Sequence, residues 1–242
     1  YKLVVPLMAA GLLLLPFLAA ALFSLVRALH SPGAKPLRAV CVQGLLAGCA
    51  LWLKYTVLGF YLAWVVVLAV LYLRRGWLTQ LGRSVGAYLG GMALATLPWV
   101  VYFGVHGALG DWFTAYFYDN LFLYKGEGGG LPALAQHLWW AVRDGLPAAL
   151  LLAAFLLWAL LTRRFAAAGG VAALAAGLAA TSLMGGYLVY YGLVLAVFAP
   201  LGLVPLVRLA EKTPALLPGL AKEHGIYVTL HAPYFISLSS VE

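Results

Sequence analysis

Long apolar stretches, separated by short polar connections, run through most of this chain. Seven of them lie at about residues 3–26, 39–53, 56–73, 84–103, 145–161, 166–184 and 187–207. They lack the strict apolar–polar alternation of membrane β-strands, and most approach the length of a helix that crosses a bilayer. The pattern predicts an all-α fold: a polytopic membrane helix bundle with about seven transmembrane helices.

The second and third stretches belong to one apolar run, residues 39–73, which is interrupted only by Gln43, Lys54 and Thr56. A single helix of this length would measure about 52 Å, against about 30 Å for the hydrocarbon core. An ammonium at the centre of that core costs on the order of 3 kcal/mol. We therefore expect the chain to cross the membrane, turn at Lys54 and Tyr55, and cross back.

Basic residues lie in alternate connections, as the positive-inside rule describes for cytoplasmic loops. They are Arg27, Lys35, Arg38, Arg74, Arg75, Arg83, Arg163, Arg164, Arg208 and Lys212. This topology places Lys54 at the outer face, where a lysine stem can extend to water. It places the connection 104–144 outside as well. The aromatic segment 111–124 in that connection is either a helix lying in the headgroup region or an aromatic belt at the end of a span.

Composition excludes a soluble domain, because 65% of the residues are hydrophobic and only 9% are charged. The net charge of +8 comes largely from the basic connections. It forms no basic stripe with interleaved aromatic residues, so we expect no nucleic-acid partner. The spans contain no carboxylate of the kind that ion-driven transporters use, and no catalytic constellation is visible.

The candidate substrate-binding residues are Lys54, Tyr55, Asp111 and Asp119, all expected at the outer face. A cation there can pair with a lipid phosphate, so we expect membrane lipid as a partner. The alternative is that Lys54 is a helix-end lysine that merely reaches the surface.

Glycines four residues apart predict close contacts between helices. One such pair is Gly44 with Gly48, and another is Gly86 with Gly90.

The segment GLLAGCALWLKYTVLGFYLAW, residues 44–64, resembles the membrane helices of GT-C superfamily glycosyltransferases, in the group like dolichyl-phosphate-mannose-protein mannosyltransferases. DWFTAYFYDNLFLY (111–124) and GGYLVYYGLVLAVFAPLGL (185–203) are similar to further parts of that family's pattern. The resemblance covers about residues 1–210.

The resemblance implies transfer of a sugar from a polyprenyl-phosphate carrier to an acceptor at the outer membrane face. Such enzymes use an acidic residue of the first outer loop as a base or metal partner, and no loop of this chain matches it. We therefore expect an N-terminally truncated, inactive part of the enzyme, with the sugar donor held at Lys54. We expect no certain cofactor, and a divalent metal in the full-length enzyme is left open.

The membrane region 1–209 is followed by residues 210–242, which are mostly polar up to IYVTL at 226–230. A short amphipathic stretch precedes IYVTL. We expect a short soluble α/β-like C-terminal tail on the cytoplasmic side. AKEHGIYVTLHAPYFISLSS, which begins at Ala221, resembles an early strand of the endonuclease IV barrel, a family of zinc-dependent apurinic-site nucleases. That resemblance implies a metal ligand at His231. The alternatives are a tail joined from a different protein and an ordinary cytoplasmic tail.

Three classes of function remain open. The first is a membrane glycosyltransferase of the bacterial plasma membrane. The second is a membrane transporter or lipid flippase, which predicts internal repeats or broken helices with polar residues at mid-membrane. The third is a non-catalytic membrane scaffold.

Overall fold

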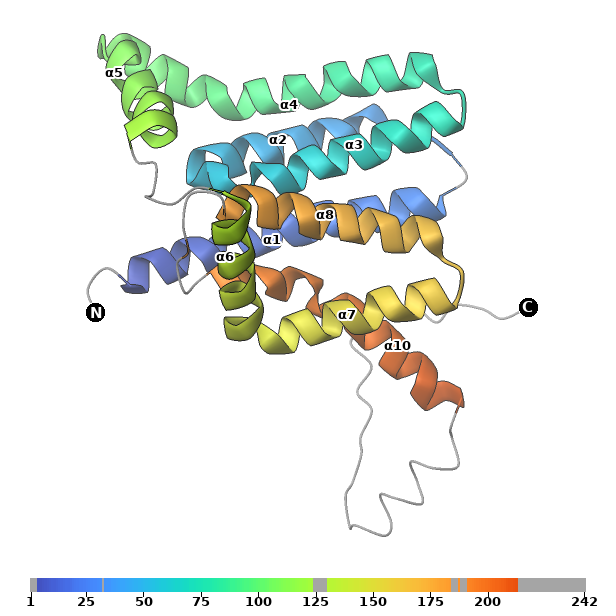
Figure 1. The fold of residues 1–242 in the computed structure, drawn as a ribbon. Coiled ribbons are helices and arrows are strands. Elements are labelled where there is room, and N and C mark those ends of the chain that lie inside the picture. The colour runs from blue at the N-terminus through green and yellow to red at the C-terminus, as the bar shows by residue number, and fades with distance from the viewer. Residues whose placement is uncertain (1–3, 32, 124–129, 184–186, 188–190, 213–242) are drawn as a thin grey trace. The chain divides into compact units, whose positions relative to one another are not determined.

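The computed structural model describes residues 4–31, 33–123, 130–183, 187 and 191–212 (Figure 1). The chain divides into two units, residues 1–203 and 204–242. All packing described below lies within the first unit. The second unit is described only from residue 204 to residue 212, where it forms the end of a helix. The expected α/β tail and His231 lie outside the described residues.

The described residues form helices and no strands, which confirms the predicted all-α class for this part of the chain. The longer helices are α1 (Val4–His30), α2 (Leu37–Lys54), α3 (Leu58–Arg74), α4 (Leu78–Val105), α6 (Leu131–Asp144), α7 (Leu146–Leu161), α8 (Phe165–Leu183) and α10 (Ala199–Lys212). Short helical segments complete the set: η1 (Tyr55–Val57), α5 (Leu109–Phe113), the π-helical η2 (Thr114–Leu123), α9 (Tyr191–Val194) and η3 (Leu195–Phe198).

By length and composition, five stretches of the described residues can cross a membrane. They are Leu12–His30, Leu37–Arg74, Leu78–Val105, Phe165–Leu183 and Tyr191–Leu209. A sixth is added if α6 and α7, which meet at a bend of 99°, form one broken span. These helices fit an integral membrane protein. The predicted number of about seven spans stays a prediction.

The apolar run that contains Lys54 is folded back on itself. Helix α2 ends at Lys54, η1 makes a short turn, and α3 returns beside α2 (Figure 1). Lys54 has an extended backbone, with φ −164° and ψ 96°, and so interrupts the helical path. The sequence predicted this turn because the run is too long for one span.

The basic connections after α1 and after α3 lie together at the end of α2 and α3 that is opposite Lys54. Arg75 donates a hydrogen bond to the Ser31 carbonyl at 3.1 Å, and Gln80 donates one to the Lys35 carbonyl at 3.2 Å. The pKa of Lys35 is lowered, first by burial and then by the nearby charge of Arg27. The connections after α1 and after α3 therefore meet, as expected if both lie on one side of a membrane.

Two helix pairs are held together by glycines. The pair α2 and α4 meets at Gly44 and Gly91, where a Cβ atom would collide with the Tyr88 and Cys41 carbonyl groups respectively. The pair α3 and α8 meets at Gly59 and Gly177 in the same way. Gly44 contacts a neighbouring helix as predicted. The predictions for Gly86 and Gly90 were wrong, because a Cβ atom at either position has nothing within 4 Å, and Gly91 makes the contact instead.

The neighbouring glycines Gly90 and Gly91 allow a matched test of this packing. We expect Gly91→Leu to lower the stability of the purified protein in detergent by at least about 2 kcal/mol, because the side chain cannot fit against α2. Gly90→Leu adds the same side chain on an exposed face and should leave thermal unfolding unchanged or raise its midpoint. Equal effects of the two substitutions would contradict the packing of α2 on α4.

Candidate functional site

The end of the bundle that carries Lys54 is built from aromatic side chains. Lys54 is half-buried at the last turn of α2, and its Nζ lies 4.2 Å from the ring centroid of Tyr191. A cation above an aromatic ring is attracted by the negative face of the ring. Tyr191 begins α9, far from Lys54 in sequence, so the fold brings together two residues that no local pattern links.

Tyr55 faces the segment that follows α4 and consists of α5 and η2. Its ring lies 6.1 Å from that of Tyr116 in η2, and the Tyr116 hydroxyl donates a hydrogen bond to the Leu51 carbonyl. Trp52 contacts the same segment through Trp112, with ring centroids 4.7 Å apart. Its indole N–H also donates to Thr96 on α4 at 3.0 Å. These contacts fix α5 and η2 against the turn.

The two predicted acids lie on this same aromatic segment. Asp111 is exposed in the first turn of α5, next to Trp112, and Asp119 is half-buried in η2. The structure therefore brings the segment that carries Asp111 and Asp119 to the turn that carries Lys54 and Tyr55. The described part of this segment forms two short helical pieces, one of them π-helical. Its place in the headgroup region or at the end of a span stays a prediction.

A second group of side chains, which sequence reasoning missed, adjoins Tyr191. The Tyr187 hydroxyl donates a hydrogen bond to Asp144 Oδ2 at 2.5 Å, and Arg143 donates to Oδ1 at 2.9 Å. Burial and the Asp144 hydrogen bond raise the pKa of Tyr187 to about 12. Trp140 packs against Tyr187 with ring centroids 5.5 Å apart. In the sequence, the only signal for these tyrosines is the resemblance of residues 185–203 to the family pattern.

The end of α8 packs against the turn between α2 and α3 and hydrogen-bonds to its backbone. Thr181 Oγ1 accepts a hydrogen bond from the Gly59 N–H, and Ser182 Oγ donates to the Thr56 carbonyl, both at 3.1 Å. Such bonds satisfy backbone groups where the helical ladder of α2 and α3 is broken. The turn is therefore held by side chains from a distant helix, which keeps Lys54 and Tyr55 in place.

Among the described residues, no group of three or more His, Cys, Asp or Glu side chains is placed to hold a metal ion. The described residues of the Lys54 turn and of the segment packed on it combine an ammonium with phenols and with the carboxylates of Asp111 and Asp119, set among aromatic rings. Chemically, this set can hold an anion through Lys54 and accept hydrogen bonds from hydroxyl groups through the acids.

Comparisons of this chain with protein-family models, with curated proteins and with solved structures gave no match. What the site can bind follows from its own residues and their geometry.

We predict that Trp52 is the main residue that holds α5 and η2 against the end of α2. We expect Trp52→Ala to raise amide hydrogen exchange across residues 109–119 about tenfold or more, because the substitution removes the ring contacts and the bond to Thr96. Trp139→Ala removes an equally large ring that is 65% exposed, and should leave exchange in this segment unchanged. Unchanged exchange in Trp52→Ala would show that other contacts hold the segment.

Proposed function

We propose that this chain is part of a membrane glycosyltransferase that resembles the GT-C superfamily and uses a polyprenyl-phosphate sugar donor at the outer face of the membrane. The observation that supports this most is the position of Lys54. It lies at a turn between two apolar helices, at the end of the bundle opposite the arginine-rich connections. A lysine at the end of a membrane helix lies in the headgroup region, at the same depth as the lipid phosphates.

The surroundings of Lys54 favour binding of a lipid-linked phosphate over simple surface exposure. The side chain lies over the Tyr191 ring, within an aromatic cluster, and does not extend alone from a helix end. Aromatic side chains are favoured at the headgroup level because they have an apolar body and a polar tip. A phosphate that approaches Lys54 gains a charge-assisted hydrogen bond, while the rings shield the contact from water.

Asp111 and Asp119 are proposed to contact the sugar. Their segment packs on the Lys54 turn through Trp112 and Tyr116, so a sugar attached to a phosphate at Lys54 would lie near this segment. Carboxylates accept hydrogen bonds from sugar hydroxyls. We assign no catalytic residue to this chain and propose that it contributes donor binding.

A membrane transporter or lipid flippase is the second candidate. The sharp bend between α6 and α7 favours it, because transporters often place substrates at broken helices. The polar group at this bend, Asp144 with Tyr187, lies in the same part of the fold as Tyr191. A binding experiment with a polyprenyl phosphate does not separate the two candidates, but transport of that lipid between leaflets does.

The test is binding of a polyprenyl phosphate to the purified chain in phosphatidylcholine vesicles. We expect Lys54→Ala to weaken binding about tenfold or more, because the phosphate loses its charge-assisted bond. Lys54→Arg should retain most of the affinity. Arg83→Ala removes one positive charge at the other end of the bundle and serves as the control, which should bind like the unmodified chain.

If Lys54→Ala and Arg83→Ala have the same small effect, Lys54 is a helix-end lysine and the proposal fails. If the unmodified chain also moves the lipid between leaflets, the transporter is favoured over the glycosyltransferase.

A further inference from the structure

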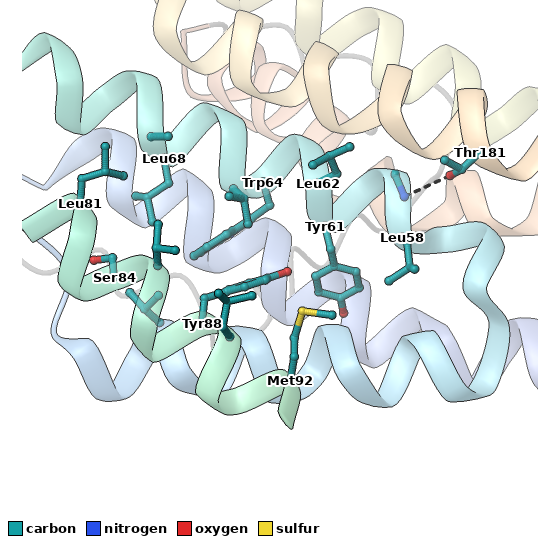
Figure 2. A pocket seen from close by; sticks show the side chains of 16 residues that line it. Leu58, Tyr61, Leu62, Trp64, Leu68, Leu81, Ser84, Tyr88, Met92 and Thr181 are labelled. Atoms are coloured by element: carbon teal, nitrogen blue, oxygen red, sulfur yellow. Dashed lines mark hydrogen bonds between the residues drawn. The ribbon is translucent and has the colours of Figure 1, made fainter. Parts of the chain in front are cut away.

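Two hollows that lie along α3 differ in the charge of their linings. The larger, of about 430 Å³, lies between α3 and α4, and no charged side chain belongs to its lining (Figure 2). An apolar hollow of this kind selects no particular ligand. The smaller, of about 320 Å³, lies between α3 and α8 and has Arg74 in its lining. We call it the Arg74 groove, and its charge points to a class of ligand.

The Arg74 groove follows the last part of α3. Val66, Val70 and Arg74 line it at a spacing of four residues, which places them on one face of the helix. Eight residue steps correspond to about 12 Å of helix. Ala166 and Gly169 of α8 line the groove from the other side. The groove is therefore apolar along most of its length and ends at a guanidinium.

Small residues of α8 leave this space open. Helix α8 begins with the sequence FAAAGG at residues 165–170, which offers little side-chain volume after Phe165. A Cβ atom at Gly170 would meet Leu29 of α1 at 2.9 Å, so Gly170 belongs to the packed interior. A Cβ atom at Gly169 has nothing within 4 Å, although Gly169 lines the groove. The part of the groove beside Gly169 is therefore unfilled by the protein.

The groove can be reached from the hydrocarbon layer. The exposed fraction of Val66 is 50% and that of Val70 is 42%, and both lie in a stretch that can cross a membrane. A hydrocarbon chain can therefore enter from the side. Arg74 is also exposed, at the end of α3, so its guanidinium is accessible to a ligand that lies in the groove.

The positive charge at this end of the groove is not balanced by an acid of the described residues. Arg163 and Arg164 directly precede α8, whose start lies at the same end of the bundle as the end of α3 (Figure 1). Among the described residues, the Arg74 side chain makes no hydrogen bond or ion pair. The ion pair found there joins Arg143 and Asp144 in α6. A ligand that complements this end of the groove is an anion.

We propose that the Arg74 groove binds a phospholipid of net negative charge. The headgroup phosphate accepts charge-assisted hydrogen bonds from Arg74, and one acyl chain lies along Val66, Val70 and Gly169. Basic pockets between membrane helices bind anionic headgroups in this way. A zwitterionic lipid has the same chains, but its positive group would lie near the arginines. The site is at the opposite end of α3 from Lys54 and does not depend on the function proposed for Lys54.

The test is native mass spectrometry of the purified chain in a neutral detergent, titrated with dioleoylphosphatidylglycerol or with dioleoylphosphatidylcholine. The two lipids have the same acyl chains and differ in net charge. We expect the first phosphatidylglycerol to bind about fivefold more tightly or better than the first phosphatidylcholine. Arg74→Gln should remove this preference, because the phosphate loses its charge-assisted bonds. Arg74→Lys keeps the charge and should retain a preference.

A glycine substitution tests the groove itself. Gly169→Leu places a side chain in the open space and should weaken phosphatidylglycerol binding about fivefold or more, because the acyl chain loses its contacts. Gly86→Leu adds the same side chain on the exposed face of α4, and Arg83→Gln removes a positive charge of α4 that does not line the groove. Both controls should bind phosphatidylglycerol like the unmodified chain. Arg74 and Gly169 are exposed, so Arg74→Gln and Gly169→Leu should not lower the thermal unfolding midpoint without added lipid.

Equal affinity of the unmodified chain for the two lipids would overturn the proposal. Equal effects of Arg74→Gln and Arg83→Gln would also overturn it, since the lipid would then respond only to the overall charge. If Gly169→Leu binds phosphatidylglycerol like the unmodified chain, no acyl chain lies in the groove and the proposal fails.

Discussion

The fold depends on one constraint, which is that the apolar run containing Lys54 is too long to cross a bilayer once and carries a charge near its middle. Backbone groups cannot remain unpaired in hydrocarbon, so a reversal there must be short and its groups must be satisfied. The turn at residues 55–57 meets this requirement through Thr181 and Ser182 of α8.

Close backbone contacts at glycines organise the rest of the described bundle. They pair α2 with α4 and α3 with α8, and this division leaves the hollow between α3 and α4. The same pairings bring the end of α8 to the turn, which positions Lys54 near Tyr191. The site at the end of the bundle and the hollow within it are thus two consequences of one packing scheme.

Apolar length and charge in the sequence predicted the helices and the turn. Both properties act locally, and burying a charge or an unpaired backbone group in hydrocarbon costs several kcal/mol, on the order of 3 for a lysine. The partners at the site could not be predicted in this way. Tyr191 and the Tyr187–Asp144 pair lie in elements far from Lys54 along the chain, and only tertiary packing joins them. Which glycine contacts a neighbour, Gly91 rather than Gly90, depends on helix rotation, which a spacing of small residues does not fix.

The central claim is that the Lys54 turn and the basic connections lie on opposite sides of the membrane. It is tested by labelling single cysteines with a maleimide that cannot cross the membrane, in sealed vesicles and after replacing Cys41 and Cys49 by serine. Gly33→Cys reports the connection between α1 and α2, and Thr114→Cys reports the segment packed on the turn; both positions are exposed. In vesicles of one orientation, only one of the two cysteines should react. Reaction of both from the same side would contradict the account.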